Sequence, residues 1–282
     1  MNFEKVYKEY QVYARSRHKK QGFITMDQAF NIHILSYFRN MNVNEISKKD
    51  LVEWQNVILS KNFSNKYNAM LYYSFNSFMK YCVICSYVNE NMVSAVGTFK
   101  KKIEYKEHKT YNIWQFRKFR FNIEDYVIKE YFNFIFFNGT RPGETMALKF
   151  SDLEGNFIHI RHNMIRKGKR ELDTPKNQSS FRVIRISLLT KIRILFLRNY
   201  YIKVYGTSNY DYFIFGGIKP LAPTTIDRYK SKACIKANLF EITQHEFRHS
   251  YATRMIKNKP INYVSKSMGH SRISTTLDIY VH

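Results

Sequence analysis

The sequence predicts a mainly α-helical protein of the α+β class, in which a small antiparallel β-sheet interrupts the helices. Apolar residues recur at helical spacing through most of the 282 residues. Two segments, 156–165 and 180–187, instead alternate apolar and polar residues as strands do. A charged stretch without clear periodicity, 99–112, follows the first helical part. We therefore expect two domains, over residues 1–105 and 106–282.

Three helices are expected in the first domain, which indicates a small helical bundle. Apolar side chains form a helical stripe through residues 26–41. Ser47 suits the N-cap of a helix that begins near Lys48, because its hydroxyl can accept a hydrogen bond from a free main-chain N–H. A third apolar run covers residues 68–88 and ends at the polar residues that follow it.

The second domain is expected to combine helices with the sheet. One helix ends at Asn138 and Gly139, a pair that favours a helix end, and Pro142 opens the next helix. A basic connection, residues 166–179, separates the two strands. The remaining helices are expected near 112–121, 124–138, 188–204, 223–237, 245–258, 260–268 and 273–280.

The chain is strongly basic. Lys and Arg number 46 against 22 Asp and Glu, which gives a formal net charge of +24 and a pI near 9.8. The excess is spread along the chain, since residues 1–110 carry 17 basic and 9 acidic side chains and residues 111–282 carry 29 and 13. Such a surface attracts polyanions, and nucleic acid is the expected partner. On charge alone, a membrane-surface protein or a ribosomal protein is an alternative.

Other features indicate a cytoplasmic protein without a membrane-inserted segment. No stretch approaches the roughly 20 apolar residues that a membrane-spanning helix needs. The first residues lack the apolar run of a signal peptide, and three cysteines do not make a disulfide framework. Cys82 and Cys85 form a C-x-x-C pair within an apolar helix, so we expect both to be buried core thiols.

One stretch has the spacing of a zinc protease. His245, Glu246 and His249 match H-E-x-x-H, which places two histidines one helical turn apart. Zinc also needs a third protein ligand, and only Asp278, His270 or His282 could supply it downstream. Arg248 would put a cation beside the dication. We therefore expect no metal site here, and the protease remains a remote alternative.

The same stretch also suits a phosphate. His245 and Arg248 are three residues apart on one helix face, and the donor fork of an arginine matches phosphate oxygens. Arg141 follows a glycine-containing turn and precedes the helix opened by Pro142, where free N–H groups also favour an anion. Glu144 either orients Arg141 or simply occupies the first turn of that helix.

Three further residues complete the candidate set. Lys176 lies on the connection between the strands, from which an ammonium group can reach a substrate. His270 follows a glycine, and Tyr280 comes ten residues later. Each of these residues alone has an ordinary structural explanation, and only their order along the chain distinguishes them.

In this order the motifs resemble those of the tyrosine recombinases, also called phage integrases. The resemblance rests on "GTRPGE", a lysine between strands, "HEFRHSYAT", "MGHSRISTT" and the terminal "IYVH", and it covers nearly the whole chain. It implies that residues 1–105 are a core-type DNA-binding domain and that residues 106–282 are the catalytic domain. In this family the position of Glu246 is variable, so the zinc-like spacing is a coincidence.

The resemblance implies a metal-free cleavage of DNA with no other cofactor. Arg141 and Arg248 would stabilise the negative charge that builds on the phosphate, and Tyr280 would be the nucleophile. His245 would accept the tyrosine proton, Lys176 would protonate the leaving sugar oxygen, and His270 would bind the phosphate. The product is a covalent 3′-phosphotyrosine link, which a free 5′-hydroxyl then resolves.

The function implied is site-specific recombination, for integration or excision of a phage or other mobile element. The expected partners are double-stranded DNA at specific sites, three further copies in a homotetramer on two sites, and DNA-bending accessory proteins. Two alternatives share the family chemistry or fold. A type IB topoisomerase would relax DNA without paired sites, and a catalytically inactive relative would only bind DNA.

Overall fold

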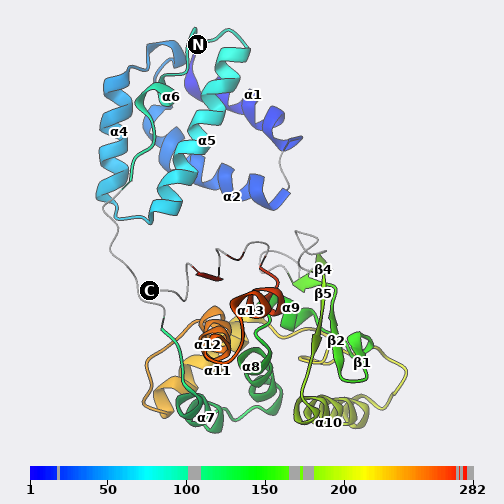
Figure 1. Cartoon of the computed structure of the whole chain (residues 1–282). Helices are drawn as coiled ribbons and strands as arrows, with labels where there is room; N and C mark the ends of the chain where they lie inside the picture. Colours follow the sequence, from blue (N-terminus) through cyan, green and yellow to red (C-terminus); the bar gives the residue numbers. More distant parts are fainter. Residues whose placement is uncertain are drawn as a thin grey trace. The chain divides into compact units, whose positions relative to one another are not determined.

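A computed structural model of the chain describes residues 1–17, 20–100, 109–164, 172–173, 181–270, 273 and 276–277 (Figure 1). The chain divides into two compact units, Met1–Lys106 and Glu107–His282. Helices dominate both units, and the second also contains a small antiparallel sheet, so the expected fold class is confirmed. Within the described ranges, no helix combines the length and the apolar character that crossing a membrane requires.

The first unit is built from helices only, over its described residues. These are α1 (Phe3–Arg15), α2 (Lys20–Phe30), a π-helical turn (Asn31–Leu35), α3 (Ser36–Phe38), a 3-10 turn (Val43–Glu45), α4 (Lys48–Ser60), α5 (Asn65–Ile84) and α6 (Met92–Val96). Ser47 caps α4 as expected, because its hydroxyl accepts from the Asp50 N–H while the Asp50 carboxylate accepts from the Ser47 N–H. The sequence had not delimited α1, α6 or the π-helical turn.

Aromatic rings fill the core of the first unit. The rings of Tyr7 and Phe30 stack at 4.0 Å between centroids, and Phe3 packs against Phe78 at 4.8 Å. Trp54 is buried among them, and its indole N–H donates to the His33 carbonyl at 2.7 Å. These contacts tie α1, α2, α4 and α5 into one body.

The expectation for the two neighbouring cysteines is half wrong. Cys82 is buried in the core of the first unit, but Cys85 is exposed. Helix α5 ends at Ile84, so Cys85 lies in the turn after the helix and does not share its buried face.

The second unit combines helices with a small sheet, which lies at one side of the unit (Figure 1). Its helices are α7 (Ile113–Phe121), α8 (Tyr126–Asn138), α9 (Pro142–Ala147), a 3-10 turn (Phe150–Asp152), α10 (Leu188–Tyr205), α11 (Pro223–Lys236), α12 (Gln244–Ile256) and α13 (Ile261–Met268). Its strands are β1 (Leu153–Glu154), β2 (Phe157–Ile160), β3 (Asn163–Met164), β4 (Leu172–Asp173) and β5 (Arg182–Arg185). Strands β1, β2 and β5 form an antiparallel sheet in that order, and β3 pairs with β4.

Helix α8 is the centre of the second unit. Most of its residues are buried, and it packs along α12 (Figure 1). Phe247 of α12 is fully buried and contacts Phe132 of α8 and Phe119 of α7. Helix α8 ends at Asn138, and Gly139 takes a left-handed conformation with φ of 65°. The chain then turns directly into α9, so this packing fixes where α9 begins relative to α12.

Candidate active site

Arg141 is held at the start of α9 by Glu144. The Arg141 N–H donates to Glu144 Oε2 at 2.8 Å, and its guanidinium donates to Oε1 at 2.7 Å. Glu144 is the third residue of α9 and is 2% exposed. Glu144 therefore both caps the first turn of α9 and orients Arg141. These two roles were alternatives in the sequence analysis, and the structure shows both.

Arg248 enters the site from α12. Its side chain is buried, and the guanidinium donates to the main-chain carbonyl of Met268 at 2.8 Å. His245 lies in the first turn of the same helix and is exposed. The arginine is thus fixed by the fold, whereas the histidine lies where solvent or a substrate can reach it.

Glu246 caps the N-terminus of α12. Its carboxylate accepts from the N–H of Thr243, while the Thr243 hydroxyl accepts from the Glu246 N–H at 3.3 Å. This capping box begins α12. Over the residues that the structure describes, no three His, Cys, Asp or Glu side chains gather as metal ligands would.

Arg182 also belongs to the site, and the sequence reasoning missed it. It comes from β5 and donates through both terminal nitrogens to the Glu144 carboxylate, at 3.0 and 2.9 Å. Its side chain is 8% exposed. A signal for it exists in the sequence, because Arg182 shares a strand face with the buried Ile184 and Ile186. A charged residue at a buried strand position is normally paired.

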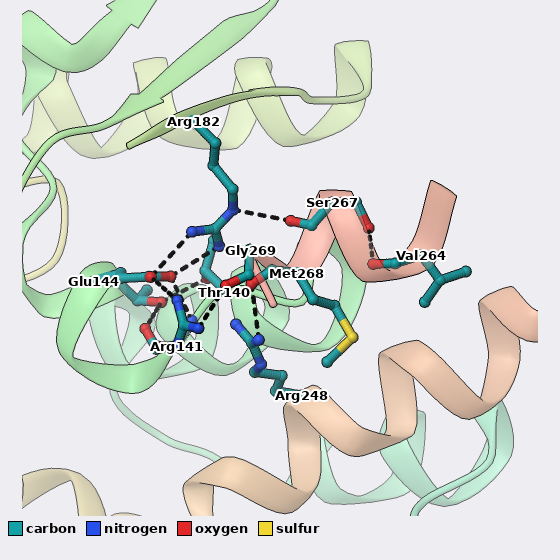
Figure 2. A network of polar contacts seen from close by, with 10 residues as sticks. Thr140, Arg141, Glu144, Arg182, Arg248, Val264, Ser267, Met268 and Gly269 are labelled. Atoms are coloured by element: carbon teal, nitrogen blue, oxygen red, sulfur yellow. Dashed lines mark hydrogen bonds and ion pairs between the residues drawn. The ribbon is translucent and has the colours of Figure 1, made fainter. Parts of the chain in front are cut away.

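The C-terminal end of α13 collects all three arginines. Three consecutive carbonyls, those of Ser267, Met268 and Gly269, accept hydrogen bonds from Arg182, Arg248 and Arg141, respectively (Figure 2). The distances are 2.9, 2.8 and 2.7 Å. The last carbonyls of a helix have no partner within the helix and carry the negative end of its dipole, so they suit cations. Side chains from α9, β5 and α12 therefore meet at one point.

Gly269 permits this meeting. It ends α13 in a left-handed conformation with φ of 69°, which favours glycine. A Cβ atom at this position would lie 2.8 Å from the Arg182 guanidinium. A larger residue would therefore strain the backbone and displace the arginine.

His270 follows directly after this glycine. Its Nδ1 lies 2.8 Å from the Thr276 hydroxyl. Burial, together with the charges of Arg248 and Arg141, lowers the pKa of His270 to about 4. The imidazole is therefore neutral at neutral pH, and one of its nitrogens carries a hydrogen that it can donate.

The site carries an excess of positive charge. Burial opposes the charged form of Glu144, but hydrogen bonds and charge from Arg182, together with the charges of Arg141 and Arg248, outweigh it and lower its pKa to about 2. Two guanidinium groups thus donate to one carboxylate, and Arg248 adds a third positive charge. The arrangement suits the binding of a further anion.

Two expected site residues lie outside the described residues. These are Lys176 and Tyr280. Most of the expected helix 273–280 and most of the basic connection 166–179 lie outside them as well. Of the six candidates, the structure brings Arg141, Arg248 and His270 together and places His245 one turn before Arg248 on α12.

Comparison with protein families gives two matches. Residues 110–282 match the phage integrase family, and residues 2–59 match the phage integrase N-terminal SAM-like domain. The ICEBs1 integrase of Bacillus subtilis is 24% identical, over 89% of this chain and 71% of its own length. A XerC-like tyrosine recombinase of Caldanaerobacter subterraneus is 26% identical, over 89% of this chain and 72% of its own length.

Solved structures share the fold over the whole chain. The Tn1549 transposon integrase, in complex with a circular intermediate DNA, superposes with a TM-score of 0.77 at 18% identity and covers 100% of this chain and 95% of its own. A lambda integrase dimer bound to a core site superposes with a TM-score of 0.76 at 15% identity, over 99% of this chain and 95% of its own.

Proposed function

The chain belongs to the phage integrase family and is a site-specific recombinase that breaks and rejoins DNA, and from this premise we propose that it cleaves through Tyr280 at the arginine site described above. The family expected from the motifs is confirmed. The relatives include the ICEBs1 integrase and the fold neighbours include the Tn1549 transposon integrase and lambda integrase, and we propose that this chain is likewise the integrase of a mobile element.

The observation that carries the catalytic proposal is the meeting of three arginines at the end of α13. Attack on a phosphodiester builds negative charge on the non-bridging oxygens, and fixed cations that meet this charge lower the barrier. Arg141 and Arg248 come from different elements but bind adjacent carbonyls, so both can face one phosphate. Each is already held by protein hydrogen bonds, and little reorganisation is needed when the charge develops.

The other roles follow from the proton transfers that the reaction needs. A tyrosine hydroxyl with an ordinary pKa near 10 is a poor nucleophile until a base takes its proton. In this proposal His245 accepts the proton of Tyr280, and His270 donates a hydrogen bond to the phosphate. Lys176 gives a proton to the departing 5′ oxygen, because an alkoxide is a poor leaving group. The phosphotyrosine link conserves the bond energy, and neither a metal nor another cofactor has a step in this scheme.

The proposed substrate is double-stranded DNA, bound by both positively charged parts of the chain. Fold neighbours include a lambda integrase tetramer bound to a Holliday junction, and we propose a homotetramer on two sites for this chain as well. DNA-bending accessory proteins would set the geometry of those sites. Because the proposed substrate is DNA and the relatives above are bacterial proteins, we propose the bacterial cytoplasm as the place of action.

Covalent trapping tests the proposal. Wild type and Tyr280→Phe are incubated, with and without EDTA, with a supercoiled plasmid that carries the DNA flanking the native gene, and the reaction is stopped with SDS. The expected result is a protease-sensitive protein–DNA adduct with wild type and none with the variant. An adduct that survives Tyr280→Phe would refute the assignment of the nucleophile, and one that EDTA abolishes would refute the metal-free mechanism.

A further inference from the structure

We propose that Arg182 is a positioning residue for this reaction: it neutralises Glu144, so that the charge of Arg141 stays available to the scissile phosphate. This inference rests on the proposed function, since it concerns the same site. It adds a residue that the sequence motifs did not contain.

Glu144 is shared evenly between the two arginines. Its Oε1 accepts from the Arg141 and Arg182 guanidinium groups at 2.7 and 3.0 Å. Its Oε2 accepts from the Arg141 main-chain N–H at 2.8 Å and from the second nitrogen of Arg182 at 2.9 Å. The Arg182 guanidinium therefore donates to both carboxylate oxygens, whereas the Arg141 guanidinium donates to one. The fork-to-fork pairing is between Glu144 and Arg182.

Exposure separates the roles of the two arginines. The side chain of Arg182 is 8% exposed, and that of Arg141 is 32% exposed. Arg182 thus lies behind the carboxylate, and Arg141 keeps an open side from which a phosphate can approach. Without Arg182, the Glu144 carboxylate would keep the Arg141 guanidinium as a hydrogen-bonded partner, and its negative charge would cancel much of the attraction of Arg141 for a phosphate.

A second anchor fixes the geometry. Arg182 Nε donates to the Ser267 carbonyl, and Arg141 donates to the carbonyl of Gly269, two residues later on the same helix end. Each of the two guanidinium groups therefore donates both to the Glu144 carboxylate and to a main-chain carbonyl at the end of α13. A change at Arg182 is transmitted to Arg141 through both.

Charge compensation by Arg182 has a measurable consequence that a purely structural role of the side chain would not have. Arg182→Met keeps much of the side-chain length but removes the bidentate partner of Glu144, so that its charge acts on Arg141 more strongly. We expect the single-turnover rate of cleavage to fall about 100-fold, the scale of a lost transition-state contact. Glu144→Gln combined with Arg182→Met removes both charges. We expect this double variant to cleave about tenfold faster than Arg182→Met alone, because residues in one network do not act additively.

Arg185→Met is the matched control. It removes one exposed arginine from the same strand, three residues from Arg182, and we expect it to cleave at the wild-type rate. Affinity for DNA is measured alongside with a labelled duplex, and we expect Arg182→Met to change the rate far more than the affinity. Failure of wild type to form the adduct would overturn the proposed function itself.

Two outcomes would overturn the role of Arg182 while leaving the recombinase intact. One is wild-type cleavage by a folded Arg182→Met, and the other is a folded double variant that is no faster than Arg182→Met. If Arg182→Met does not fold, Arg182→Lys decides, because lysine keeps the charge without the fork. Cleavage within about tenfold of wild type then supports charge compensation, and a folded but inactive Arg182→Lys contradicts it.

Discussion

Glu144 shows how one buried carboxylate organises the site at the scale of single residues. It is 2% exposed, yet its pKa is lowered to about 2, because the hydrogen bonds and charges of the arginines around it outweigh the cost of burial. A buried charge of this kind is retained only when it is fully paired. The carboxylate is therefore ionised at neutral pH.

This pairing predicts an acid-dependent loss of stability. The pKa falls from an ordinary 4.5 to about 2 on folding, so the unfolded chain binds the proton first as the pH drops. The contribution, on the order of 3 kcal/mol, is present above pH 4.5 and is lost as the pH falls toward 2. Urea unfolding between pH 6 and 3 should therefore show a steeper decline for wild type than for Glu144→Gln, by up to about 1.4 kcal/mol per pH unit.

A surface carboxylate provides the comparison for this experiment. Glu154→Gln removes a side chain that is 80% exposed, so most of its charge is already hydrated in the folded protein. It should leave the decline close to that of wild type. Equal slopes for wild type and Glu144→Gln would mean that the arginines do not stabilise the ionised carboxylate.

The sequence identified Arg141 and Glu144, which are local partners, and missed Arg182, whose carboxylate partner is distant along the chain. Arg141 and Glu144 are three residues apart, and the helix start after the glycine turn was enough to connect them. Arg182 lies 38 residues from Glu144, and their contact depends on how β5 is placed against α9. No local pattern contains that register, although the buried strand face of Arg182 was a clue.

At the scale of elements, the C-terminal end of α13 binds the three arginine side chains. Its three last carbonyls accept one arginine each, and its final glycine lets Arg182 approach. The geometry depends on helix packing as well, since α12 brings Arg248 and is itself fixed by α8. A defect at this helix end should therefore affect chemistry more than stability.

Two glycines in the same backbone conformation test whether a defect at this helix end affects cleavage separately from stability. Gly269 and Gly206 both end a helix at positive φ, 69° and 72°, but only an added Cβ at Gly269 meets a neighbour, Arg182, while nothing lies within 4 Å at Gly206. Either alanine should cost about 1 kcal/mol of stability for the left-handed backbone. We expect Gly269→Ala also to slow single-turnover cleavage at least tenfold, and Gly206→Ala to cleave normally.

Urea unfolding and the covalent-adduct assay measure the two effects on the same samples. Normal cleavage by Gly269→Ala would show that the close approach of Arg182 is not required.

The positive φ at such helix ends was foreseeable from the sequence at Gly139, where an Asn-Gly pair follows an apolar run. The beginning of α1 also carried a local signal, which the sequence reading did not use, because the Asn2 side chain caps this helix by accepting from the N–H groups of Glu4 and Lys5. The π-helical turn after α2 was not foreseen.

At the scale of the whole molecule, charge is the property that the sequence predicted most directly. The net charge of +24 is shared between the two parts of the chain, so neither is a neutral scaffold. Composition alone left a ribosomal or membrane-surface protein open, because it carries no geometry. The order of the motifs decided between these classes, and it did so through residues that meet only in the folded second unit.

This charge predicts the salt dependence of DNA binding. Each phosphate that a protein neutralises releases counterions, so the logarithm of the binding constant falls with the logarithm of salt concentration by about 0.9 per contact. If both charged parts contact the backbone, six or more phosphates are involved, and raising salt from about 50 to 200 mM should weaken binding about 1000-fold or more. Fluorescence anisotropy with Tyr280→Phe measures this without cleavage. With Arg141 intact in this variant, a loss of affinity under tenfold over the same salt range would place the excess charge away from the DNA.

If Arg141 contacts one phosphate as proposed, adding Arg141→Ala to Tyr280→Phe should reduce the slope by about one.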